Sequence, residues 1–174
     1  ELPNRSKIFL DYAHTPEALK TAINALKEHY KKKITVVFGC GGERDKSKRK
    51  LMGKIANQLC NKVIITDDNP RNENPKIIRE QILSVIKKNK IKEIPGRKKA
   101  IIYALKNSDP YEIILVAGRG HETHQDFGKR KVSLSDKKII QNFNSKKINT
   151  KINYFKNNST CLLYTSDAAD ERNS

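Results

Sequence analysis

The chain has 174 residues, of which 36% are hydrophobic and 32% are charged. This length is sufficient for one domain with a hydrophobic core, and the composition is not that of a disordered chain. No apolar run approaches the ~20 residues that a membrane-spanning helix needs. The 3 cysteines form no CxxC motif, which favours a reducing compartment over a disulfide framework or a zinc site.

The formal net charge of +17 is typical of modules that bind nucleic acid or acidic surfaces. The excess, however, consists mostly of lysines spread along the chain, as at 31–33, 87–88, 98–99 and 146–147, with few aromatic residues between them to stack bases. Lysine, isoleucine and asparagine are also abundant together, as an AT-rich coding sequence would produce. We therefore expect no specific nucleic-acid partner, and we keep a basic binding module as the alternative function.

Strands and helices alternate along the chain. Apolar runs predict strands at 8–10, 34–38, 63–66 and 113–117. Helices are expected after Thr15, across 51–59, from Pro75, across 100–105 and at 136–143, with a hairpin at 123–134 around Gly128. This alternation predicts an α/β fold, a Rossmann-like, doubly wound, mostly parallel sheet with helices on both faces.

Local signals support two of these helices. Thr15 is a good N-cap, Pro16 suits the first helical position, and Glu17 complements the helix dipole. In the second helix, helical spacing predicts one buried face. The residues expected on that face are Leu51, Met52, Ile55, Ala56 and Leu59.

The chain is expected to contain one domain. Residues 1–6 are interpreted as the remnant of an interdomain linker, residues 7–144 as the domain, and residues 145–174 as a disordered or artefactual tail. Apolar periodicity weakens from about residue 144. Residues 161–171 change composition sharply and resemble a translated sequencing-library adapter, so the tail is left out of the fold prediction.

Four loops at 11–14, 39–44, 67–71 and 118–122 follow the predicted strands. In a doubly wound sheet, such loops meet at one edge, where ligands bind. The loop at 67–71 contains two carboxylates, an amide, a proline and an arginine whose planar guanidinium suits two-point binding of a carboxylate. This set suits a ligand that carries both an ammonium and a carboxylate. Taken alone, the same loop is equally well explained as a solvated polar turn.

The other loops are less specific. Asp11 and His14 could contact a nucleotide or could simply form the entry to a helix. The glycines at 39–42 permit a close backbone approach but match no phosphate-binding motif, so a tight turn explains them equally well. Arg44 could bind a carboxylate and Glu122 an ammonium. The residues around Glu122 match no zinc pattern, so no metal site is predicted.

Together, residues 11–19, 37–45, 66–71 and 115–122 resemble the C-terminal domain of the Mur ligases, most closely the branch that adds diaminopimelate. The resemblance covers roughly residues 7–144. It implies a cytoplasmic, monomeric, ATP-dependent and ADP-forming ligase that makes an amide bond in peptidoglycan synthesis with Mg²⁺. Another ligase of the superfamily, such as folylpolyglutamate synthetase, would not need the residues at 68–71.

The resemblance also implies roles for individual residues. It places meso-diaminopimelate at Arg44, Asp68, Asn69, Pro70, Arg71, Gly118 and Glu122, and it places Asp11 and His14 on the nucleotide side. ATP, Mg²⁺ and the substrate UDP-N-acetylmuramoyl-L-alanyl-D-glutamate would be bound mainly by family domains that this sequence lacks. We therefore expect no catalytic residue or metal ligand here, and a chain that is inactive alone. Arg119 stands where the family usually has lysine, and it is left unassigned.

Overall fold

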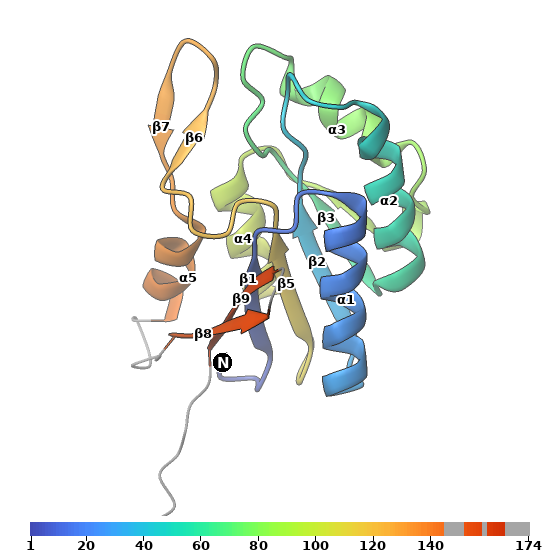
Figure 1. The fold of residues 1–174 in the computed structure, drawn as a ribbon. Coiled ribbons are helices and arrows are strands. Elements are labelled where there is room, and N and C mark those ends of the chain that lie inside the picture. Colours follow the sequence, from blue (N-terminus) through green and yellow to red (C-terminus); the bar gives the residue numbers. More distant parts are fainter. Residues whose placement is uncertain (145–151, 158–159, 166–174) are drawn as a thin grey trace, which may run out of the picture.

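The computed structural model describes residues 1–144, 152–157 and 160–165. Its centre is a parallel sheet in the order β4-β3-β2-β5-β1 (Figure 1). The strands are β1 (Lys7–Asp11), β2 (Ile34–Phe38), β3 (Lys62–Ile65), β4 (Ile91–Glu93) and β5 (Ile113–Ala117). Four of the five strands lie where the sequence predicts them, whereas the short β4 was not predicted. Only one β4 residue, Ile91, is apolar, so β4 lacks the apolar run that marks the other strands.

Helices cover both faces of this sheet. The helices are α1 (Pro16–Tyr30), α2 (Ser47–Leu59), α3 (Pro75–Leu83), α4 (Arg97–Lys106) and α5 (Asp136–Asn144), with a short 3₁₀ turn at Lys88–Lys90. Buried residues of α1, α2 and α3 share one core cluster with the sheet, and those of α4 and α5 share the other. The predicted doubly wound α/β fold is confirmed.

Each central strand is buried on both faces because successive side chains enter opposite cores. In β1, Phe9 joins the cluster with α1, whereas Ile8 and Leu10 join the cluster with α4. The continuous apolar runs that predicted the strands are the consequence of this double burial. Within the described part of the chain, no helix is both long and apolar enough to cross a membrane.

The predicted cap of α1 and the predicted buried face of α2 have different outcomes. At the start of α1, the Thr15 hydroxyl accepts a hydrogen bond from the backbone N–H of Ala18 at 3.2 Å, as the cap predicts. In α2 the prediction for Leu51 was wrong, because this side chain is 47% exposed. The core side of α2 is instead centred on Met52, Gly53 and Ala56, and Leu51 lies about 100° around the helix from Met52.

A hairpin of β6 (His124–Asp126) and β7 (Lys131–Ser133) rises from the same end of the molecule as the loop before α3 (Figure 1). It lies within the hairpin region predicted from the sequence. Beyond α5, β8 (Ile152–Asn157) pairs with β9 (Thr160–Thr165), and β9 pairs antiparallel with the outer side of β1. Both strands lie within residues 145–174, which the sequence analysis interprets as a disordered or artefactual tail. The division at residue 144 stays a prediction.

Candidate functional site

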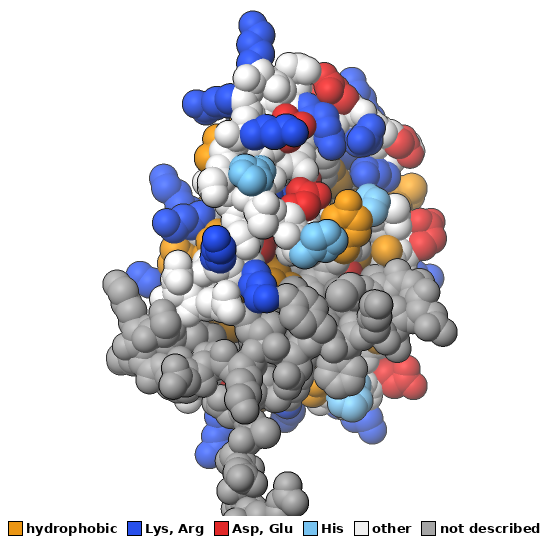
Figure 2. All heavy atoms as spheres, turned by 60° about the vertical axis from the view of Figure 1, so that its left-hand side comes forward, with side chains coloured by type: hydrophobic (Ala, Val, Ile, Leu, Met, Phe, Trp, Pro, Cys, Tyr) orange, Lys and Arg blue, Asp and Glu red, His pale blue; other side chains and the backbone are white. Residues whose placement is uncertain are grey.

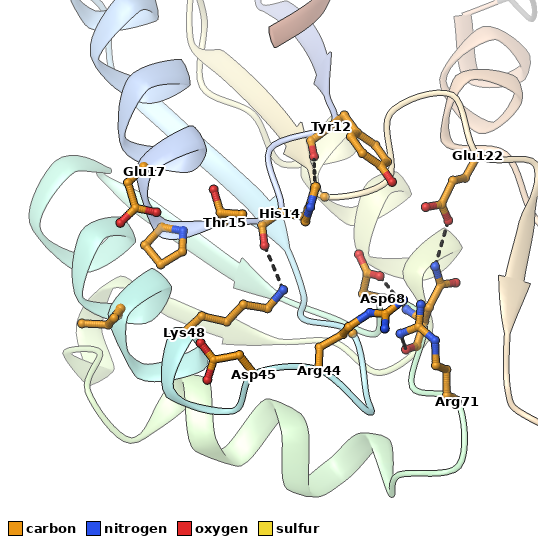
Figure 3. A pocket seen from close by; sticks show the side chains of 15 residues that line it. Tyr12, His14, Thr15, Glu17, Arg44, Asp45, Lys48, Asp68, Arg71 and Glu122 are labelled. Carbon is orange, nitrogen blue, oxygen red and sulfur yellow. Dashed lines mark hydrogen bonds between the residues drawn. The ribbon is translucent and has the colours of Figure 1, made fainter. Parts of the chain in front are cut away.

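A pocket of about 540 Å³ lies at the carboxyl edge of the parallel sheet, where the loops after β1, β2, β3 and β5 meet (Figure 3). The predicted site residues that line it are His14, Arg44, Asp68, Asn69, Arg71, Gly118 and Glu122. Two further predicted residues, Asp11 and Pro70, are buried and do not line it. The structure therefore brings four loops that are distant in sequence around one cavity.

One side of the pocket is acidic, and we call Asp68 and Glu122 the acidic wall. Asp68 is 8% exposed, and its Oδ1 accepts a hydrogen bond from the backbone N–H of Asn69 at 2.7 Å. Burial raises the pKa of this carboxyl, and the neighbouring Arg97 charge opposes the shift. Glu122 comes from the opposite loop, and its Oε2 accepts from the Asn69 side-chain amide at 2.9 Å (Figure 3). Asn69 thus joins the loops that carry the two carboxylates.

Gly118 gives the acidic wall its close packing. Its backbone φ of +111° lies in a region that side chains disfavour. A Cβ atom at this position would lie 2.8 Å from Oδ2 of Asp68. Glycine is therefore required here both by the backbone and by the carboxylate that lines the pocket.

The other side of the pocket is basic, and we call Arg44 and Arg71 the basic wall. Arg71 donates from Nη1 to the carbonyl oxygen of Gly42 at 2.7 Å, and its Nε lies 3.8 Å from Oδ2 of Asp126. Arg44 is exposed, and among the described residues it makes no hydrogen bond or ion pair. Figure 3 shows both side chains at the cavity, with Glu122 pointing toward them from the opposite side. The pocket therefore presents carboxylates and guanidinium groups together.

The glycine-rich loop after β2 packs against the loop after β3. The backbone N–H of Gly42 donates to the carbonyl oxygen of Asn69 at 2.9 Å, and a Cβ atom on Gly42 would overlap the carbonyl of Pro70. These glycines let two protein loops approach each other closely. This packing agrees with the interpretation of the segment as a tight turn. Pro70 thus supports the pocket from behind.

A partly buried ion pair fastens the same two loops. Arg49 of α2 is fully buried and donates to both carboxylate oxygens of Glu73 at 2.9 and 3.0 Å, and also to the carbonyl oxygen of Gly41 at 3.2 Å. The hydrogen bond from the Arg49 side chain lowers the pKa of Glu73 to about 2. The basic wall is therefore anchored to α2.

The β6–β7 hairpin supports the pocket from the outside. The backbone N–H of Arg71 donates to the carbonyl oxygen of Asp126 at 3.0 Å, and the Asp126 N–H donates to Oδ1 of Asn69 at 2.9 Å. The side-chain amide of Gln125 donates to the Asp68 carbonyl. Sequence analysis predicted the hairpin but not this contact, because no local signal indicates which loop a hairpin will meet.

The loop after β1 forms the far end of the pocket. Tyr12 packs edge-on against His14, with ring centroids 4.8 Å apart, and is stacked on His121 at 5.8 Å. Asp11 is fully buried; its Oδ1 accepts from the backbone N–H of Ala13 at 2.6 Å, and its Oδ2 has no hydrogen-bond partner among the described residues. Burial raises the pKa of Asp11 to about 6. Of the predicted nucleotide-side pair, only His14 reaches the cavity.

Several lining residues were not assigned from the sequence. They are Tyr12, Thr15, Pro16, Glu17, Gly41, Asp45, Lys48 and Leu51. Most are sequence neighbours of assigned residues, so the extent of each loop was a usable signal. Lys48 was hidden within a basic run, yet its Nζ donates to the carbonyl oxygen of His14 at 3.0 Å and joins two loops of the pocket (Figure 3).

The donor set does not suit a resident metal ion. Within residues 1–144 and the two described strands beyond them, no group of three or more His, Cys, Asp or Glu side chains could hold one. The acidic wall contributes two carboxylates, and both already have arginine neighbours at 3.9 and 3.3 Å. This part of the chain therefore does not fit a Mg²⁺ site.

Comparison with known proteins gives the family. A family profile described as "Mur ligase, glutamate ligase domain" matches residues 2–120. The chain belongs to this family. This finding agrees with the resemblance drawn from the four loops, three of which lie entirely within the matched region.

Relatives of this Mur ligase domain carry one recurring name. A UDP-N-acetylmuramoyl-L-alanyl-D-glutamate–2,6-diaminopimelate ligase from Buchnera aphidicola subsp. Schizaphis graminum is 50% identical over 145 residues, which is 83% of this chain and 29% of the relative. A ligase of the same name from Rickettsia bellii is 49% identical over 141 residues, or 80% of this chain and 30% of the relative. A solved structure of that name is 33% identical with a TM-score of 0.77, covering 83% of this chain and 30% of that chain. The chain thus spans less than a third of the length of these relatives.

Proposed function

We propose that this chain is the amino-acid-binding domain of the ATP-dependent ligase that adds meso-diaminopimelate to UDP-N-acetylmuramoyl-L-alanyl-D-glutamate in peptidoglycan synthesis. The observation that carries the proposal is the pairing of an acidic and a basic wall in one pocket. The names of the relatives support the same substrate. A cytoplasmic location and a monomeric state belong to this proposal.

The two walls match the two charges at the distal end of diaminopimelate. Its ammonium would lie against Asp68 and Glu122, and its carboxylate against Arg44 and Arg71. L-Lysine lacks the distal carboxylate and would leave the basic wall without a partner. Because a hydrogen bond to a charged group contributes ~1.5–3 kcal/mol, loss of two such bonds would discriminate by several orders of magnitude.

In this proposal, the domain binds and orients the incoming amine, and ATP supplies the activation of the D-glutamate carboxylate. ATP and Mg²⁺ would be bound mainly by the regions of the relatives that this chain does not cover, and we assign no step to the metal within this domain. His14 would face the nucleotide side of the closed site. Asp11 would act from beneath the same loop, where it holds the backbone of Ala13. No residue of the domain is proposed to exchange a proton or form a covalent intermediate.

A chimaeric ligase tests the proposal. Residues 7–144 would replace the matching domain of the Buchnera relative, and ADP release would be measured with the UDP-linked dipeptide and either meso-diaminopimelate or L-lysine. We expect release that depends on meso-diaminopimelate. Release that responds to L-lysine and not to diaminopimelate would refute the substrate, and a soluble, folded chimaera that responds to neither would refute the ligase function.

The alternative, a basic binding module, is supported by the net charge of +17. On the face shown in Figure 2, Lys and Arg side chains are scattered, with acidic and neutral side chains between them. A gel-retardation assay over a range of salt concentrations separates the two functions. Binding that survives physiological salt and prefers a sequence would favour the alternative, whereas weak binding that salt abolishes fits scattered lysines.

A further inference from the structure

A buried ionic cluster lies directly behind the acidic wall. It consists of Arg97 at the start of α4, Arg119 in the loop after β5, and Asp136 at the start of α5. Both arginines are 0% exposed and Asp136 is 1% exposed. Burial of a charged side chain costs free energy unless the charge is paired and hydrogen-bonded.

Asp136 is the central member of the cluster. Arg97 donates from Nε to both of its carboxylate oxygens, at 3.0 and 2.9 Å, and from Nη2 to Oδ2 at 2.7 Å. Nη1 of Arg119 lies 3.8 Å from Oδ1 of the same carboxylate. One buried acid therefore serves as counterion to two guanidinium groups that come from different elements.

The same two arginines also face the acidic wall. Nη1 of Arg97 lies 3.9 Å from Oδ2 of Asp68, beyond hydrogen-bond distance, whereas Nε of Arg119 donates a hydrogen bond to Oε2 of Glu122 at 3.3 Å. The Nη1 atoms of both arginines are buried without a hydrogen-bond partner in the described residues. Arg97 thus has an unused donor that could turn toward Asp68, whereas Arg119 is already paired with Glu122.

The charges of this cluster and of the acidic wall do not balance. Three carboxylates face two guanidinium groups, so one negative charge is in excess, and the two carboxylates other than Asp136 line the pocket. Without the charge of Asp136, two positive charges would balance the two carboxylates of the wall. Arg97 would need to approach Asp68 by less than ~1 Å to form a full hydrogen bond.

We propose that Asp136 is a positioning residue: it holds Arg97 and thereby leaves Asp68 free to bind the ammonium of the incoming amino acid. The inference rests on the proposed function, because it concerns the same pocket. It extends the site to α5, whose first residue lies 14 positions beyond Glu122 in the sequence. Asp136 itself does not line the pocket.

The test is a kinetic comparison in the chimaeric ligase. In D136N the amide preserves the shape but not the charge, and we expect KM for meso-diaminopimelate to rise about tenfold to hundredfold, as for the loss of most of one charged hydrogen bond. The expected kcat at saturation and the KM values for ATP and the UDP-linked dipeptide stay within about threefold. A KM for diaminopimelate within twofold of wild type, or an equal rise of all three KM values, would overturn the proposal.

A double variant separates charge balance from structural support. R97Q/D136N restores the excess of one negative charge and leaves no buried arginine directly facing Asp68, so KM should recover toward the wild-type value. Loss of structural support alone predicts the opposite, a double variant worse than D136N. If D136N does not fold, the double variant carries the test by itself, and a tenfold rise in its KM would overturn the proposal.

The chain offers a matched control for these variants. Asp67 precedes Asp68, is half-buried, and pairs with Arg79, but it does not line the pocket. D67N should lower thermal stability without a selective change in KM for diaminopimelate, and a selective rise in that KM would overturn the assignment to Asp136. If the wild-type chimaera releases no ADP with diaminopimelate, the proposed function fails; if it does and D136N is unchanged, only this inference fails.

Discussion

The two walls of the pocket are built in different ways. The acidic wall is backed by three buried ionic groups, and both of its carboxylates lie near an arginine. The basic wall has no such buried cluster: Arg71 donates to a backbone carbonyl and lies 3.8 Å from the half-buried Asp126, and Arg44 is exposed. The acidic wall is therefore backed by a buried charge network, whereas Arg71 of the basic wall has a backbone carbonyl and a longer, partly exposed ion pair.

This difference follows from burial. Asp68 lies in the interior, where an isolated carboxylate would become protonated, so nearby positive charge is needed to keep it ionised. That positive charge must in turn be restrained, which is the task we assign to Asp136. Arg71 and Arg44 reach water, which solvates a guanidinium, so neither needs a buried counterion of this kind. The Gly42 carbonyl oxygen orients Arg71, and the Asp126 carboxylate at 3.8 Å is beyond hydrogen-bond distance, so the guanidinium can still pair with a ligand carboxylate.

The largest expected effect comes from Arg71. R71A in the chimaeric ligase should raise KM for meso-diaminopimelate about 100-fold, because two charged hydrogen bonds of ~1.5 kcal/mol or more are lost. R71K should raise it about tenfold, since an ammonium replaces the two-point fork. The measurement is steady-state ADP release at varied diaminopimelate.

Arg130 offers a control for Arg71. It lies in the same hairpin region, with its guanidinium 5.4 Å from the centroid of the Phe127 ring, and it does not line the pocket. R130A should leave KM within twofold of wild type. An unchanged KM in R71A would remove Arg71 from the site and with it the basic wall.

Gly118 tests how tightly the acidic wall is packed. G118A should cost about 2 kcal/mol of stability, because alanine is strained at a φ of +111°. It should also raise KM for diaminopimelate several-fold, since the new methyl group displaces Asp68. G96A is the matched control, because Gly96 has a φ of +84° but an added methyl group there would meet only the Lys99 side chain, at 3.9 Å. If G118A and G96A change KM for diaminopimelate equally, displacement of Asp68 has no effect on diaminopimelate binding.

Glu73 tests how the basic wall is anchored. Its folded-state pKa of about 2 lies below the unfolded value of 4.5, so the pairing with Arg49 stabilises the fold above pH 4.5 and is lost as the pH falls toward 2. E73Q should therefore lower the free energy of unfolding at pH 7 by about 1.5 kcal/mol. Urea unfolding at several pH values should show the gap from wild type closing between pH 4.5 and 2. A gap that does not change with pH would contradict the pairing.

Much of the fold could be predicted because its signals are local. Buried strands require apolar runs, and the cap at Thr15 needs only the residues that follow it. Leu51 shows the limit of this reasoning. An apolar residue at a helical spacing was assigned to the core, but the core contains Met52, and Leu51 lines the pocket. When apolar residues cover a wide arc of a helix, the packing of the neighbouring helix decides which of them are buried.

The lining of the site was predictable to the extent that it follows strand ends. The acidic and basic walls lie on loops that the doubly wound order brings together. The layer behind them was not predictable, because Arg97 sits in a basic run and Asp136 opens an ordinary helix. Nothing local distinguishes these residues from solvated charges. Their pairing depends on the packing of α4 beside α5, which is a property of the whole fold.

The smallest effect is expected from Arg44, and it separates an exposed charge from a supported one. R44Q should leave stability within about 0.5 kcal/mol of wild type, because Arg44 has no ion pair or hydrogen bond among the described residues to lose. Its KM for diaminopimelate should rise only about threefold to fivefold in low salt, as for an exposed ion pair of less than ~1 kcal/mol. Because salt screens exposed charges over a Debye length of ~3 Å at 1 M, the difference from wild type should vanish in high salt, whereas that of R71A persists. If the KM changes of R44Q and R71A both vanish in high salt, the two arginines are equally exposed to solvent in the complex. Neither side chain would then be held in place by the protein.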